Sequence, residues 1–148
     1  MEDVRNLFHV LNRRFSLLQK NGFREEGIDI SLIHSHILFE IDKHTQPSMQ
    51  QLADLLGIDI TTFSRQIQTL VKANLVKKRA KQEDKRVYVL SLTQKGKQTA
   101  DQIDTIINTH LERVFLKLND FEKDTIIHSL KIVTKAMGEV RNGNMIKG

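Results

Sequence analysis

The feature that most restricts the fold is the stretch Ser48–Leu92, where two short amphipathic helices precede a basic hairpin. Gln51, three residues after the opening serine, completes a capping box, and Gly57 suits the left-handed position that ends a helix. Asp59 is a favourable N-cap for the second helix, which Asn74 can end in the left-handed region. Two such helices joined by Gly-Ile-Asp are typical of a helix-turn-helix, whose second helix is the recognition helix.

The recognition helix is expected to have two faces of opposite character. Apolar residues recur at helical spacing and predict a face that packs on a core: Ile60, Phe63, Ile67, Leu70 and Val71. Short polar or basic side chains, suited to bases or phosphates, fill the other positions: Thr61, Thr62, Ser64, Arg65, Gln66, Gln68, Thr69 and Lys72. Gln50 and Gln51, at the start of the preceding helix, can offer N–H groups to a phosphate.

The hairpin that follows is predicted from β-forming residues on both sides of a polar turn. Leu75–Arg79 and Arg86–Leu92 read as strands, with Ala80–Lys85 between them. A basic hairpin directly after a recognition helix is a wing. Asp84 and Arg86 lie two apart on a strand-like segment, so they are expected on one face as a pair, and Lys81 and Lys85 add positive charge.

Positive charge is concentrated in this same part of the chain. Ser48–Thr99 holds ten basic and four acidic residues, a net charge of +6, whereas the rest of the 148 residues carry −1. A surface that binds a polyanion needs this arrangement, because neutralising phosphates releases counterions. The sequence therefore predicts that the helix-turn-helix and wing bind nucleic acid.

Composition excludes several other classes. The chain has no cysteine, which excludes disulfides and thiol ligands. No run of about 18 apolar residues predicts a membrane span, and the N-terminus does not resemble a signal peptide, so cytoplasmic residence is expected. Neither a phosphate-binding loop nor a G-x-S-x-G or H-E-x-x-H motif is present, so no enzyme, cofactor or metal is predicted.

The remaining segments predict four further helices. They are expected over about Glu2–Asn21, Ser31–His44 and Thr93–Leu118, and in a last helix that starts at an Asn119–Glu122 capping box, with a loop over Gly22–Gly27. The prediction is a mainly α (α+β) single domain of six helices and a two-stranded wing. Residues about 31–92 would form the DNA-binding lobe. The apolar helices about 1–21 and 93–142 would form a homodimer that binds an inverted repeat, with recognition helices ~34 Å apart.

Several short motifs together resemble the MarR family of transcriptional regulators. The matching residues are Leu52, Ala53, Gly57, Ser64, Arg65, Leu70, Leu75, Val76, Asp84, Lys85, Arg86, Leu92, Thr93 and Gly96. Chain length and helix order match as well, so the resemblance covers essentially the whole sequence. It implies the same dimer, and a wing whose Asp84 orients Arg86 toward the minor groove of double-stranded DNA. It also implies an effector pocket, often for small aromatic or phenolic anions, drawn here from the first, second and fifth helices.

Arg65 is the residue most expected to read a base, because an arginine near the start of a recognition helix can bind guanine through two hydrogen bonds. Arg86 is expected in the minor groove, whose negative potential attracts arginine. The predicted function is a sequence-specific regulator of transcription: a homodimeric repressor that a small-molecule effector releases from its operator.

Two alternatives remain open from the sequence. Some relatives of this family sense zinc, and His110 near Glu112 admits that interpretation. His34 and His36 point apart on one helix, however, and His9, His44 and His128 are isolated, so core or interface histidines are favoured. The other alternative is a protein-interaction module that has lost DNA binding, which the basic wing disfavours.

Overall fold

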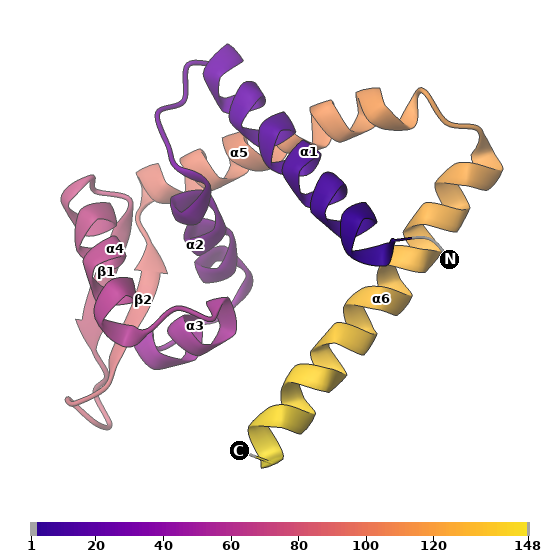
Figure 1. The fold of residues 1–148 in the computed structure, drawn as a ribbon. Helices are drawn as coiled ribbons and strands as arrows, with labels where there is room; N and C mark the ends of the chain where they lie inside the picture. The colour runs from indigo at the N-terminus through magenta and orange to yellow at the C-terminus, as the bar shows by residue number, and fades with distance from the viewer. Residues whose placement is uncertain (1–2, 148) are drawn as a thin grey trace. The chain divides into compact units, whose positions relative to one another are not determined.

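The computed structural model describes residues 3–147, with side chains up to Arg141, and contains six helices and one antiparallel hairpin (Figure 1). Their order is α1 (Val4–Glu25), α2 (Leu32–Lys43), α3 (Met49–Leu56), α4 (Ile60–Lys72), β1 (Val76–Ala80), β2 (Tyr88–Leu92), α5 (Gln94–Phe115) and α6 (Asp120–Lys147). The mainly α prediction with a two-stranded wing is confirmed. The chain divides into two compact units at the His110–Leu111 bond, and each unit is described by itself.

The helix caps form where the sequence predicts them. The Ser48 hydroxyl accepts from the Gln51 amide at 3.0 Å, while the Gln51 side chain accepts from the Ser48 amide at 2.9 Å. Gly57 ends α3 with φ +68°, and Asn74 follows α4 with φ +61°. The Asn119–Glu122 capping box also forms, with reciprocal bonds of 2.8 and 3.0 Å.

The first helix differs from its predicted extent. Glu2 lies outside the described residues, and the helix runs on to Glu25 instead of ending at Asn21. Gly22 is therefore helical, not the start of a loop; only Gly27, with φ +69°, adopts the turn conformation. A methyl group on Gly22 would lie 2.8 Å from Ile106 of α5, so this glycine permits the close approach of two helices.

The core of the first unit is built from one face of each short helix. Ile37 and Leu38 of α2, Leu52 of α3, and Phe63 of α4 are almost inaccessible to solvent, as is Leu90 of β2. In α4 the buried face is narrower than predicted. Ile67 and Leu70 join Phe63 in the core, whereas Ile60 and Val71 remain 41% and 40% exposed at the two ends of the helix.

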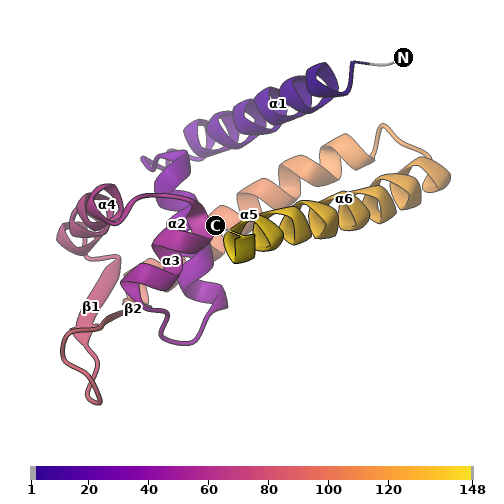
Figure 2. The same cartoon turned by 60° about the horizontal axis from the view of Figure 1, so that its bottom comes forward.

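The first strand lies one residue later than predicted and the second begins two residues later, and the hairpin is hydrogen-bonded to the segment before α3. β1 and β2 pair in register from Val76 opposite Leu92 to Ala80 opposite Tyr88. The Leu90 amide also donates to the carbonyl of Pro47, just before α3, at 2.9 Å. The closed end of the hairpin extends away from the helices of this unit (Figure 2).

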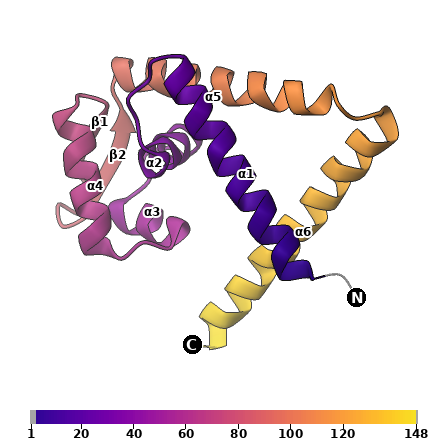
Figure 3. The same ribbon diagram turned by 45° about the horizontal axis from the view of Figure 1, so that its top comes forward.

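The passage from the wing to α5 closes against the end of α4. The Thr93 hydroxyl donates to the Asn74 carbonyl at 2.7 Å and accepts from the Gly96 amide at 2.9 Å, so Thr93 caps α5 as predicted. A methyl group on Gly96 would lie 1.9 Å from the Leu75 carbonyl oxygen. Only glycine permits this contact, which explains why Gly96 occupies the last position of the motif formed with Leu92 and Thr93. Figure 3 shows α4, β1 and α5 around this junction.

The long helices carry much of the apolar surface. In the predicted α1 stripe, Val4, Leu7, Phe8, Leu11 and Phe15 are 40–56% exposed, whereas its last member, Leu18, is half-buried. α5 ends at Phe115, earlier than predicted, and α6 continues to Lys147. No helix among the described residues is long and apolar enough to cross a membrane.

Candidate nucleic-acid interface

The first turn of α4 is organised by Asp59. Its carboxylate accepts from the Thr61 amide at 2.9 Å and from the Thr62 hydroxyl at 2.5 Å. The Thr62 hydroxyl, followed by the two backbone amides, lowers the pKa of Asp59. The helix start is thereby held as a charged cap, but the Thr62 side chain is engaged within the protein.

The outer face of α4 presents three long polar side chains to solvent. Arg65, Gln68 and Lys72 are exposed, and none of them makes a side-chain hydrogen bond or ion pair within the described part of the chain. Thr69 differs, because its hydroxyl donates to the Arg65 carbonyl at 3.2 Å. These three side chains are therefore free to reach a ligand.

Gln66 occupies a different position from its predicted neighbours. It is half-buried, and its Oε1 accepts from the Nε2–H of His34 in α2 at 2.6 Å. This bond ties the recognition helix to the helix behind it. His34 could not be identified as the partner beforehand, since the two residues lie 32 positions apart.

The glutamines at the start of α3 are also engaged. Gln50 Nε2 donates to Asp54 Oδ1 at 2.8 Å, and the Gln51 side chain is used by the capping box. What remains available from Gln50 and Gln51 for a phosphate is therefore mainly the positive end of the helix dipole.

The wing holds Arg86 against Asp84. Arg86 Nε donates to Asp84 Oδ1 at 3.0 Å and a second guanidinium nitrogen donates to Oδ2 at 3.2 Å, while the Arg86 side chain stays 91% exposed. The predicted pair of Asp84 and Arg86 forms, but not because the two residues share one face of a strand. Both residues lie in the turn before β2, and the Arg86 amide also donates to Asp84 Oδ1 at 3.1 Å.

The pairing fixes the charge state of the wing tip. The Arg86 side chain, followed by the Arg86 amide, lowers the pKa of Asp84 below its usual 3.8. The carboxylate is therefore ionised at neutral pH, and the pair is lost only as the pH falls through that lowered pKa. Lys81 and Lys85 are exposed beside the pair, and Lys78 lies over the Tyr88 ring, 4.6 Å from its centroid.

A separate cavity of about 420 Å³ lies between α1, α2 and α5 of the first unit. Its apolar lining includes Phe15, Phe39, Ile103 and Ile107, and its polar lining includes Gln19, His36, Lys43, Asp104 and Asn108. These are the three helices from which the family resemblance implies an effector pocket.

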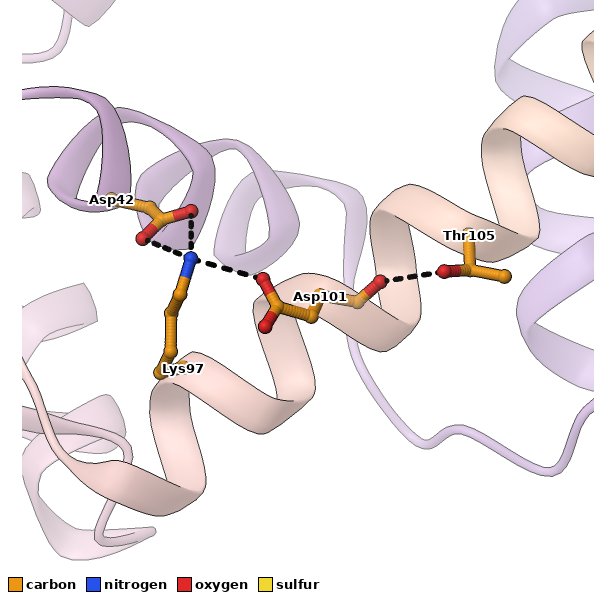
Figure 4. Close-up of polar contacts among 4 residues, drawn as sticks. All are labelled: Asp42, Lys97, Asp101 and Thr105. Carbon is orange, nitrogen blue, oxygen red and sulfur yellow. Dashed lines mark hydrogen bonds and ion pairs between the residues drawn. The ribbon is translucent and has the colours of Figure 1, made fainter.

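Three carboxylates near this cavity form a cluster that the sequence did not reveal. Asp42, Asp101 and Asp104 place oxygens within 4.8 Å of one another. The Lys97 ammonium lies between two of them, 3.0 Å from Asp42 Oδ1 and 3.0 Å from Asp101 Oδ1, and Thr105 bonds the Asp101 carbonyl behind it (Figure 4). These bonds raise the pKa of Lys97, the Asp42 bond most. A cationic group of the protein therefore already bridges two of the three possible metal ligands.

The histidines do not assemble a metal site within residues 3–141, since the only candidate cluster there consists of the three aspartates. His110, which admitted a zinc interpretation, places Nδ1 2.8 Å from the Ile106 carbonyl and Nε2 3.2 Å from Glu25 Oε2. It packs against Gly22 and connects α5 to α1.

Comparisons with known proteins agree with this architecture. The MarR family model matches residues 30–88. The regulator BilQ of Clostridium symbiosum, an HTH-type transcriptional regulator, is 25% identical over 126 residues, which cover 85% of this chain and 86% of BilQ. A MarR transcriptional regulator from Methanosarcina mazei superposes with a TM-score of 0.81 at 24% identity, over 95% of this chain and 99% of that one. An Escherichia coli MarR mutant complexed with operator DNA gives 0.75 at 21% identity, over 88% and 92%.

A helix-turn-helix followed by a basic hairpin, with long helices before and after it, defines a winged helix-turn-helix protein of the DNA-binding class. Within that class, this chain is a MarR-family transcriptional regulator. Members of the family are transcription factors and not enzymes, as predicted.

Proposed function

We propose that this protein is a homodimeric repressor that binds an inverted-repeat operator and is released from it by a small aromatic molecule. The observation that carries the proposal is that two arginines are exposed to solvent, Arg65 on the outer face of α4 and Arg86 at the wing tip. Both belong to the stretch Ser48–Thr99, whose net charge is +6. The operator complex of the similar Escherichia coli protein supports the same use of the fold.

In this proposal α4 enters the major groove. Arg65 reads a base, Gln68 and Lys72 contact bases or phosphates, and Ser64 lies close to the same groove. Thr61, Thr62 and Thr69 contribute through the backbone or the groove wall, because two of their hydroxyls are engaged within the helix. Gln66 acts through its bond to His34, which sets the orientation of the helix.

The wing enters the adjacent minor groove in this arrangement. Asp84 limits the freedom of the Arg86 guanidinium, which lowers the entropy lost when the arginine is inserted. Lys81 and Lys85 add attraction that does not depend on sequence. The start of α3, with Gln50, faces a phosphate through its helix dipole.

The dimer is proposed to form through both chain ends, residues about 1–21 and 93–142, so that the chain acts as one MarR-type domain. The exposed α1 stripe supports this proposal, because contiguous apolar surface is unfavourable in water and marks an interface. A two-fold dimer places two identical lobes on two half-sites of opposite direction.

Effector control is proposed for the cavity between α1, α2 and α5. A ligand that binds this cavity more tightly in one arrangement of the lobe than in another favours that arrangement. The free energy of operator binding can change by at most the difference between the two ligand affinities. The aromatic rings of Phe15 and Phe39 in its lining favour a flat apolar molecule.

Selection of bound sequences from a random DNA pool, followed by a gel-shift salt series on the selected site, tests the function. The expected result is a motif with two-fold symmetry whose affinity falls steeply with salt. Recovery of no motif, with no binding at low salt, would contradict DNA binding. An asymmetric motif bound by a single chain would contradict the dimer alone.

A further inference from the structure

The cavity between α1, α2 and α5 combines aromatic walls with one carboxylate that has no partner. Phe15 and Phe39 line it together with Ile103 and Ile107 of α5. Asp104, one residue along from Ile103, also lines it and is half-buried. Among the described residues, Asp104 makes no hydrogen bond and no ion pair.

The charges around Asp104 leave an excess of negative charge. Its oxygens lie within 4.8 Å of those of Asp42 and Asp101. The one ammonium group that bridges the cluster, Lys97, bonds those two aspartates and not Asp104. Burial, followed by repulsion from Asp42 and Asp101, raises the pKa of Asp104, and the weaker attraction of Lys97 and Lys43 does not cancel that rise.

Lys43, the lysine of the lining, attracts Asp104 but makes no ion pair with it. Lys43 is exposed at the end of α2, and its Nζ lies over the Phe39 ring, 4.4 Å from the centroid. It shows that this aromatic wall accepts a positive charge on its face. His36, the other ionisable residue of the lining, is exposed.

We propose that the effector of this protein is an aromatic cation, whose ring packs between Phe15 and Phe39 and whose ammonium group pairs with Asp104. The inference rests on the effector control proposed above and specifies its chemistry. It departs from the aromatic anion that the family resemblance implies. The reason is that a carboxylate on the ligand would be placed beside Asp104 and its two acidic neighbours, where like charges repel.

A bare metal ion is a less favourable occupant of the same place. Two of the three carboxylates already bond the Lys97 ammonium, so a metal would have to displace an ion pair that links α2 to α5. An organic cation needs only Asp104 and leaves that ion pair intact.

The test uses three probes of nearly equal size that differ in charge: biphenyl-4-methylamine, biphenyl-4-methanol and biphenyl-4-carboxylate. Isothermal titration calorimetry on the full chain measures the affinity of each. The amine is expected to bind most tightly and the alcohol about tenfold more weakly, because the alcohol lacks the charge that pairs with Asp104. The carboxylate is expected to bind most weakly, because its negative charge is repelled by Asp104.

Two matched substitutions identify the residue responsible. In Asp104→Asn the amine is expected to bind no better than the alcohol, to within about twofold, whereas Asp29→Asn, which removes an exposed carboxylate outside the cavity, should leave the preference for the amine unchanged. If Asp104→Asn does not fold, the order of the three probes on the unaltered protein still decides the question. Tightest binding of the carboxylate, abolished by Lys43→Gln, would overturn the cation proposal while leaving effector control intact. Binding of no probe at millimolar concentration would overturn both, whereas DNA binding is judged by the separate salt series.

Discussion

Helix α4 and the N-terminal half of α1 are both amphipathic, but only α4 completes its apolar face within the chain. Phe63, Ile67 and Leu70 of α4 are at most 1% exposed, whereas the α1 stripe from Val4 to Phe15 is 40–56% exposed. The recognition helix is therefore fixed by its own lobe, and its orientation does not depend on a second copy. The apolar surface of α1 is left for an interface. In the proposed function, reading DNA and forming a dimer use different surfaces, so substitutions should separate them.

The largest effect is expected where α4 meets the core. Phe63→Ala should lower the free energy of unfolding by about 3–5 kcal/mol, because it leaves a cavity in the middle of the lobe. Denaturant unfolding followed by circular dichroism measures the change. Ile60→Ala in the same helix is the control, with an expected loss below about 1 kcal/mol because Ile60 is 41% exposed. Equal losses for both would mean that the helix is not anchored by this face.

The next effect concerns the α1 stripe. Leu11→Glu should weaken the proposed dimer about a hundredfold or more, since an unpaired carboxylate would then be buried in an apolar interface. Analytical ultracentrifugation over a concentration series measures it. Leu17→Glu provides the control, because Leu17 is similarly exposed but lies on the opposite side of α1. No change with Leu11→Glu would show that the stripe is not the interface.

On the outer face of α4, Arg65→Ala should reduce affinity for the selected operator by about 1–3 kcal/mol. Affinity for random DNA should fall much less, because the side chain is proposed to read a base. Paired gel-shift titrations on the two DNAs provide the comparison, with Lys72→Ala expected to weaken both to a similar extent. An equal loss on both DNAs for Arg65→Ala would make Arg65 a phosphate contact.

A smaller effect is expected at the wing. Arg86→Ala should lower affinity for every duplex and reduce the slope of affinity against salt by about one counterion. A larger loss with A·T-rich flanks would locate the arginine in a narrow minor groove. Asp84→Ala leaves the charge of Arg86 in place and removes only its partner, so a smaller loss than for Arg86→Ala is expected. If Asp84→Ala matched Arg86→Ala, the pair and not the arginine alone would be required.

The smallest effect tests whether the surface of α6 around Gly138 is exposed to solvent or covered by a second copy of the chain. Gly138 lies within α6, and a methyl group added there meets no atom within 4 Å in a single chain. Gly138→Ala should therefore raise stability by about 0.5–1 kcal/mol, the usual difference between these residues inside a helix. Thermal unfolding measures it. Destabilisation instead would show that a second copy packs closely at this position.

The sequence predicted the parts of this molecule that depend on neighbouring residues. Ser48 with Gln51, Gly57, Asp59 and Thr93 each act within about four positions, so their caps could be located without a structure. The apolar spacing of α4 likewise predicted the correct face, though not the exposure of Ile60 and Val71.

The contacts that could not be predicted from the sequence join segments that meet only after folding. The bond from His34 to Gln66, the bridge from Lys97 to Asp42, and the contact of Gly22 with Ile106 join residues from 32 to 84 positions apart. Asp84 and Arg86 are an instructive intermediate case. Their spacing predicted the pair correctly, but a backbone turn and not strand alternation produces it.

The junction at Thr93 leaves α4 and α5 without a hinge between them. Thr93 bonds Asn74, and Gly96 rests against the Leu75 carbonyl, so the first turn of α5 and the last residues behind the recognition helix form one rigid corner. Ile103 and Asp104 sit about two turns further along α5. A molecule that tilted α5 from the cavity side would carry α4 with it, and in the proposed dimer that tilt would change how well two half-sites are read at once.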